Sequence, residues 1–219
     1  VIGAIFGGFP TDKFGRKPTL IVIGALYFVS AIGSGLAADP WVFAIFRFVG
    51  GLGVGASTVA APIFISEISP AKDRGKLVAL YQFNIVFGIL IAFVSNFLLR
   101  DVGTEPWRWM VGIEAVPAFL YFVMVFFIPE SPRWLVTVKG DLTSPLSTLK
   151  VIDPFTAADD QIKQIQADHK QIETKDSIWN SQYRFPLILA FFISFFNQFS
   201  GINAFLYYSP RIFEIAGLE

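Results

Sequence analysis

The sequence has no cysteine and a single histidine, and few of its residues carry a charge. The lack of cysteine excludes disulfides, thiol catalysis and cysteine-ligated metal sites. Lys and Arg number 17, as do Asp and Glu, so there is no excess of positive charge that would attract nucleic acid. The one histidine, His169, lies in a polar stretch, where a solvated surface residue is the simpler interpretation. We expect no cofactor and no bound metal.

Charged residues make up 16% of the chain and hydrophobic residues 54%, whereas soluble domains carry roughly 25% charged residues. The hydrophobic residues gather in five long runs with at most one charge each. At about 1.5 Å per helical residue, about 20 residues cross a hydrocarbon core of roughly 30 Å. The sequence therefore predicts an all-α integral membrane protein that spans the bilayer over residues 19–38, 41–61, 77–99, 109–128 and 185–209.

The chain does not begin with Met, and no basic region or cleavage site of a signal peptide precedes its first apolar residues. Residues 1–10 therefore predict the end of a further membrane helix. We interpret the sequence as a fragment cut within that helix. At its other end, the sequence stops at Glu219 without a terminal helix.

The basic residues predict the orientation in the membrane. Thirteen of the 17 Lys and Arg side chains fall on one side of the predicted spans, in the loops after residues 10 and 70 and in residues 129–184. The positive-inside rule makes that side cytoplasmic. Trp41, Trp107 and Trp109 then lie at the outer interface, where aromatic side chains gather.

Residues 129–184 form the one long polar segment, and we predict a cytoplasmic helical linker. Asp159 and Asp160 suit the first turn of a helix, and Ile162, Ile165 and Ile172 then share one face. This pattern predicts a short amphipathic helix whose apolar face is too small for a core of its own.

Two charged motifs lie at the cytoplasmic ends of predicted spans. In GGFPTDKFGRK, residues 7–17, Asp12 can pair with Arg16 and Lys17, although composition alone favours an ordinary basic loop that fixes topology. Glu67 lies between two prolines at a span end. It either ends in water or belongs to an ion-pair gate, where it caps a neighbouring helix or meets Arg16.

Two further charges lie inside predicted spans. An intramembrane arginine such as Arg47 is costly and usually faces a cavity or a carboxylate. No acidic residue near it in the sequence is an obvious partner, so we expect the partner on a helix outside this chain. Glu114 lies about one turn inside the outer face, and burial would favour its protonated form. It is a candidate proton site, or else a carboxyl exposed at the headgroups.

The run RFVGGLGVG, residues 47–55, contains glycines spaced as in a dinucleotide-binding loop, but no strand precedes it. We interpret Gly51 and Gly55 instead as a small-residue face for close helix packing.

The last apolar run carries amides in its middle, in NQFSGINAFLYY at residues 197–208. Amides in hydrocarbon need a partner, a ligand or water. Gln198 and Asn203 are about 140° apart on an unbroken helix, so we expect Ser200 and Gly201 to loosen the helix between them. Broken helices line binding cavities in transporters, and uncharged amides suit a neutral polyhydroxyl ligand.

Taken together, these motifs resemble the sugar porter branch of the major facilitator superfamily. The resemblance rests on DKFGRK at 12–17, RFVG at 47–50, the stretch from Pro62 through Glu67 to Pro70, Arg74-Gly75, PESPRWL at 129–135 and NQFSGINAFLYY. It implies a fold of twelve helices in two six-helix bundles, of which this chain would hold about helices two to seven. Residues 1–128 would be the N-terminal bundle without its first helix, 129–184 the linker, and 185–219 the start of the C-terminal bundle.

The resemblance also implies roles for individual residues. Sugar contacts would come from Gln82, Gln198, Asn203 and Tyr207, and from Asn197, where the family usually has glutamine. Proton coupling would involve Arg47 and Glu114, with an aspartate upstream of this chain. The cytoplasmic gate would consist of Asp12, Arg16, Glu67, Arg74, Glu130 and Arg133.

The predicted function is transport of a monosaccharide, a hexose or pentose, by alternating access and as proton symport. A sugar uniporter and a non-transporting sugar receptor stay open as alternatives. The sequence offers no paired catalytic carboxylates and no nucleophile with a base, so we predict no enzyme. The expected partners are a neutral sugar, a proton and the lipid bilayer, at the plasma membrane.

Overall fold

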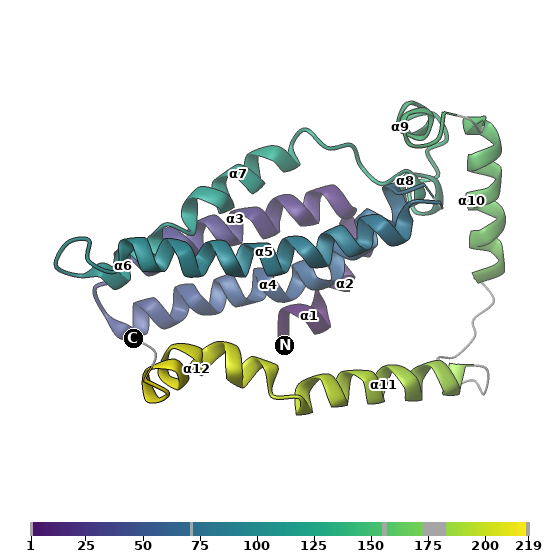
Figure 1. Ribbon diagram of the computed structural model, residues 1–219. Helices are drawn as coiled ribbons and strands as arrows, with labels where there is room; N and C mark the ends of the chain where they lie inside the picture. The colour runs from purple at the N-terminus through teal and green to yellow at the C-terminus, as the bar shows by residue number, and fades with distance from the viewer. Residues whose placement is uncertain (1, 71, 155–156, 173–182, 218–219) are drawn as a thin grey trace. The chain divides into compact units, whose positions relative to one another are not determined.

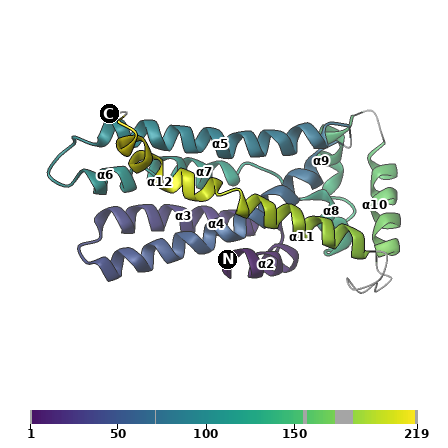
Figure 2. The ribbon, with the colours of Figure 1, turned by 60° about the horizontal axis from the view of Figure 1, so that its bottom comes forward.

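The computed structural model describes residues 2–70, 72–154, 157–172 and 183–217. The chain divides into two compact units, residues 1–169 and 170–219, which are described separately below. Within the described residues the regular structure is entirely helical (Figures 1 and 2). The first unit contains α1 Ile2–Phe6, α2 Gly8–Phe14, α3 Arg16–Leu36, α4 Pro40–Ile68, α5 Arg74–Leu99, α6 Pro106–Gly112, α7 Ala115–Val125, α8 Pro132–Thr137 and α9 Pro145–Ile152. It also contains α10 Ala158–Ile172 as far as His169.

Among the described residues, four helical stretches are long and apolar enough to cross a membrane. They are α3, α4, α5 and the pair α6–α7, and they match the predicted spans 19–38, 41–61, 77–99 and 109–128. The last span is interrupted at residues 113–114. Pro117 explains the interruption, because it has no N–H to donate to the carbonyl of Ile113 four residues earlier.

The core of the first unit lies where α3 packs between α4 and α7 (Figure 1). Leu20 and Ile23 of α3 contact Ala60 and Phe64 of α4 and Val125 of α7. These five side chains are at most 6% exposed. In contrast, α5 has no buried residue, and most of its large apolar side chains are open to the surroundings. The tight part of the unit is therefore α3 with its two neighbours.

A short helical cluster follows the membrane helices in the chain. Val136 of α8, Leu149 of α9 and Ile162 of α10 form a second small core, against which Ile165 also packs. The predicted amphipathic helix is thus confirmed as α10, with Asp159 and Asp160 in its first turn; the side chain of Ile172 lies outside the described residues. The apolar face of α10 is covered by α8 and α9 rather than by a core of its own.

The turn before α9 is ordered by one carboxylate. Asp141 accepts hydrogen bonds from the backbone N–H groups of Thr143 and Ser144, at 2.9 and 3.1 Å, and from the Thr143 hydroxyl. Hydrogen bonds from Ser144 and Thr143 hold the pKa of this carboxyl below its usual range, because they favour the charged form. The folded state therefore gains from this turn above the ordinary carboxyl pKa and loses the gain as pH falls through the lowered value.

The second unit consists of α11 Arg184–Phe199 and α12 Ile202–Ile215. The predicted span 185–209 is broken between them at Gly201, whose φ of 71° is left-handed and favours glycine. Ser200 donates its hydroxyl to the Asn197 carbonyl at 2.6 Å, within the last turn of α11. The expected loosening between Gln198 and Asn203 is therefore confirmed.

Of the two glycines expected to pack, Gly55 does so within the part of the chain that the structure describes. A Cβ on Gly55 would lie 2.6 Å from the backbone nitrogen of Ala4 in α1, whereas a Cβ on Gly51 would meet nothing within 4 Å. The prediction for Gly55 is confirmed, whereas Gly51 has no such neighbour among the described residues. Gly51 is exposed and lines a pocket instead.

Gly55→Ala should therefore destabilise the protein, because the added methyl forces α1 and α4 apart. Overpacking of this kind costs about 1–3 kcal/mol. Thermal unfolding of the purified complete protein in detergent measures the effect, and Gly51→Ala, the same change on the same helix, is the matched control. Equal midpoints for the two variants would contradict this packing.

Candidate functional site

The first candidate site is a charged network at the start of α3. Arg16 donates from Nε to Glu67 Oε2 at 2.9 Å and from Nη2 to Glu67 Oε1 at 2.8 Å. The two side chains are only 11% and 8% exposed. Nη1 donates to the Thr11 carbonyl at 3.0 Å and lies 3.3 Å from an Asp12 carboxylate oxygen. Of the alternatives left open for Glu67, the structure has the contact with Arg16, and the pair is bidentate. Nη1 of the guanidinium has partners of its own.

Glu130 completes the network at the N-terminus of α3. Its Oε1 accepts the backbone N–H groups of Arg16 and Lys17, both at 3.0 Å, and that of Ser131 at 2.8 Å. An anion suits this position because a helix N-terminus presents free N–H groups and a positive dipole. Gly15 lets the carboxylate approach, since a Cβ there would lie 2.5 Å from Glu130 Oε2.

Ser131 was not singled out in the sequence, yet it joins the network to α8. Its hydroxyl donates to Glu67 Oε2 at 2.6 Å and accepts from the backbone N–H of Trp134 at 3.2 Å. The Trp134 indole in turn donates to the Asp12 carbonyl at 2.8 Å. Serine followed by proline is a common helix start, so the sequence carried a signal for the cap but none for the contact with Glu67.

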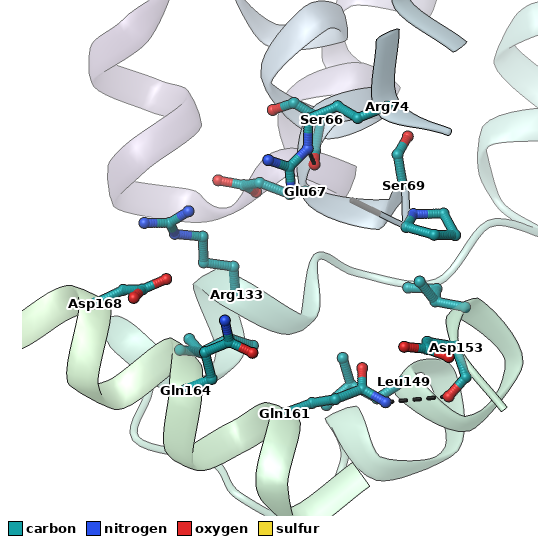
Figure 3. A pocket seen from close by; sticks show the side chains of 13 residues that line it. Ser66, Glu67, Ser69, Arg74, Arg133, Leu149, Asp153, Gln161, Gln164 and Asp168 are labelled. Carbon is teal, nitrogen blue, oxygen red and sulfur yellow. Dashed lines mark hydrogen bonds between the residues drawn. The ribbon is translucent and has the colours of Figure 1, made fainter. Parts of the chain in front are cut away.

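The six residues predicted as a gate do not form one cluster. Asp12, Arg16, Glu67 and Glu130 are joined by the contacts above, whereas Arg74 uses Nε to donate to the Ser66 carbonyl at 3.0 Å. In the part of the chain that the structure describes, the Arg133 guanidinium has no ion pair or hydrogen bond. Arg74 and Arg133 line a pocket beside the network, with Glu67 on its wall (Figure 3).

The second candidate site is a half-exposed ion pair between α4 and the α6–α7 junction. Arg47 Nη1 lies 3.0 Å from Glu114 Oε2, and the two side chains are 36% and 54% exposed. The expectation that the partner of Arg47 lies outside this chain is therefore corrected. Glu114 is 67 residues away in the sequence and reaches Arg47 because α3 packs against both α4 and α6–α7.

This ion pair borders a pocket of about 570 Å³. Tyr27 and Ser30 of α3 and Tyr121 of α7 line it together with small residues of α4. Tyr27 donates to the Ser57 hydroxyl at 2.7 Å, and Ser30 donates to the Phe46 carbonyl at 2.7 Å. A carboxylate, an arginine and hydroxyl groups therefore line one cavity.

The predicted sugar contacts are divided between the two units. Gln82 is exposed on α5 in the first unit. Asn197 and Gln198 are exposed at the end of α11, directly before the break at Gly201. The backbone of Asn203 and Tyr207 belongs to α12, and their side chains lie outside the described part. Among the described residues, no cluster of three or more His, Asp or Glu is suited to hold a metal.

Comparison with known proteins places this geometry in a family. The profile of the family described as "Sugar (and other) transporter" matches residues 1–219. The galactose-proton symporter of Escherichia coli (strain K12) is 34% identical over 221 residues, covering 99% of this chain and 47% of that protein. The putative metabolite transport protein YwtG of Bacillus subtilis (strain 168) is 36% identical over 222 residues, covering 99% of this chain and 48% of that protein.

A solved structure gives the same result for the fold. The proton:xylose symporter XylE, of the major facilitator superfamily and bound to 6-bromo-6-deoxy-D-glucose, matches with a TM-score of 0.87 and 31% identity. The match covers 100% of this chain and 51% of that one. The chain thus spans about half the length of the relatives it matches, and it has the fold of that half.

Ser131→Ala should destabilise the protein, because Glu67 loses a donor and α8 loses its cap. The expected cost is about 1–3 kcal/mol. Ser147→Ala, at an exposed position of α9 where the hydroxyl makes only a 3.4 Å contact, is the matched control and should change stability by less than about 0.5 kcal/mol. Thermal unfolding of the purified complete protein compares the two, and similar losses in both would contradict the bridging role.

Proposed function

The chain belongs to the sugar transporter family, and on this basis we propose that it is part of a protein that carries a monosaccharide across the membrane by alternating access, together with a proton. Members of this family are transporters and not enzymes. The chain is part of an integral, multi-pass membrane protein with the major facilitator fold. We propose the monosaccharide substrate, the coupling of its transport to a proton and the location in the plasma membrane.

One observation carries the sugar-binding proposal, the break at Gly201 within the amide-rich segment. The break turns the chain between Gln198 and Asn203, which an unbroken helix would point in different directions. We propose that Asn197, Gln198, Asn203 and Tyr207 hydrogen-bond sugar hydroxyls. For Gln82 on α5 we propose a sugar contact separately, from the family resemblance alone. Amides donate and accept without charge, as a neutral polyol requires.

The Arg47–Glu114 pair supports the proton-coupled form of the proposal. Protonating Glu114 removes its charge and releases Arg47, and the half-exposed setting gives protons access. Moving one charge through a membrane potential supplies about 2.3 kcal/mol per 100 mV, equivalent to about a 50-fold sugar gradient. We further propose that the Arg16–Glu67–Glu130 network, with Asp12 beside it, holds the cytoplasmic ends of the helices together. In this proposal, Arg74 and Arg133 contribute to the gate by contacting parts of the protein outside this chain.

The first test is uptake by the complete protein in cells that lack their own sugar transport. Labelled xylose, galactose and glucose should accumulate above the external concentration, and a protonophore should abolish the accumulation. Entry that persists with a protonophore but only down the gradient would make the protein a uniporter. No entry of any of the three sugars, with the protein present in the membrane, would favour a non-transporting receptor.

Glu114→Gln keeps a hydrogen-bonding side chain but cannot titrate, so it should abolish accumulation while sugar exchange down a gradient continues. Glu105→Gln is the matched control, because Glu105 also pairs with an arginine and is equally exposed, at 54%. Loss of accumulation in both variants, or in neither, would contradict the coupling role of Glu114.

Gln82→Ala should raise KM for the sugar about 2- to 10-fold, the effect of losing one hydrogen bond of about 0.5–1.5 kcal/mol. Asn84→Ala is the matched control, because Asn84 lies two positions further along α5 and points about 200° away. Concentration-dependent uptake measures both, and a larger KM change in Asn84→Ala would place the sugar on the other face of α5.

A further inference from the structure

A pocket lies beside the charged network, and the transport proposal assigns it no ligand. It has a volume of about 260 Å³ and lies between the end of α4, the start of α5 and the α8–α10 cluster (Figure 3). All of its lining residues belong to the first unit. Ligand pockets commonly measure roughly 300–1,000 Å³, so this one suits a molecule of monosaccharide size rather than a nucleotide.

Two arginines offer this pocket hydrogen-bond donors that nothing in the described chain occupies. Arg74 uses only Nε, towards the Ser66 carbonyl, and the guanidinium of Arg133 has no partner among the described residues. Arg133 lines the pocket, and Figure 3 shows its guanidinium between the side chains of Glu67 and Asp168. Glu67 is already neutralised by Arg16 and accepts from Ser131. A guanidinium fork matches the oxygens of a phosphate.

The remaining polar groups suit hydroxyls rather than a second anion. Gln164 and Asp168 of α10 present an amide and a carboxylate, and Gln161 donates to the Asp153 carbonyl at 3.1 Å, which fixes that part of the wall. The carboxylates of Asp153 and Asp168 repel a bare polyanion but accept hydrogen bonds from a polyol. Apolar wall is supplied by Pro70, Leu149, Ile152 and Ile165, which suits the C–H face of a sugar ring.

We propose that this pocket binds a soluble sugar phosphate monoester, with the phosphate on Arg74 and Arg133 and the hydroxyls on Gln164 and Asp168. Its effect on transport rests on the proposed function. A ligand that occupies the two gate arginines withholds them from the gate, so a sugar phosphate on this side should slow sugar uptake. The binding itself does not depend on transport.

Calorimetry on the purified complete protein tests the binding, with glucose 6-phosphate as the probe. We expect glucose 6-phosphate to bind at least tenfold more tightly than inorganic phosphate or glucose at this pocket. Arg133→Gln should weaken binding about tenfold or more, and Gln164→Ala, which lies outside the gate, about 2- to 10-fold. Lys150→Gln, an exposed basic residue of α9 that does not line the pocket, should leave binding unchanged.

Three results would overturn the proposal. They are no binding of glucose 6-phosphate, equal binding of inorganic phosphate, and binding that Arg133→Gln and Gln164→Ala both leave intact. Binding of vesicles that contain phosphatidylinositol 4-phosphate, without binding of glucose 6-phosphate, would replace the soluble ligand by a lipid headgroup. Uptake without binding would overturn only this inference, whereas binding without uptake would overturn the transport proposal and leave the pocket assigned.

Discussion

The ion pair between Arg16 and Glu67 is the interaction on which the rest of the structure depends. Burying two charges costs several kcal/mol per ion, and the cost is offset only where every donor and acceptor finds a partner. Here the Arg16 guanidinium is shared among Glu67, Thr11 and Asp12, while Ser131 donates to Glu67. These contacts join the ends of α2, α3 and α4 to the start of α8, so the membrane helices and the following helical cluster are held at one point.

The Arg16–Glu67 and Arg47–Glu114 ion pairs differ in how deeply their side chains are buried. Arg16 and Glu67 are close to fully buried and have additional partners, so separating them leaves charges without solvation. Arg47 and Glu114 are half-exposed, and Arg47 also lies over the Phe43 ring, 5.5 Å from its centroid. The first arrangement fits the proposed gate, and the second fits the proposed coupling site. The proposed transport cycle needs one of each.

The sequence predicted the helices and the helix break at Gly201 more fully than the contacts between helices. Apolar run length was enough for α3, α4 and α5, and the glycine in NQFSGINAFLYY was enough for the break at Gly201. The Arg47–Glu114 pair escaped prediction because it joins residues far apart in the sequence, and only the packing of α3 between its neighbours brings them together. Gly51 and Gly55 have the same local pattern, and what faces each of them differs only in the folded structure.

A double-mutant cycle on Arg16 and Glu67 tests the central claim most directly. The unfolding free energies of Arg16→Gln, Glu67→Gln and the double variant would be compared with that of the unchanged complete protein. A buried bidentate pair predicts that each single change costs about 3–5 kcal/mol, and that the double change costs at least about 1 kcal/mol less than the sum of the two. Additive losses would show that the two side chains act independently, and would contradict the network as the point that joins α3, α4 and α8.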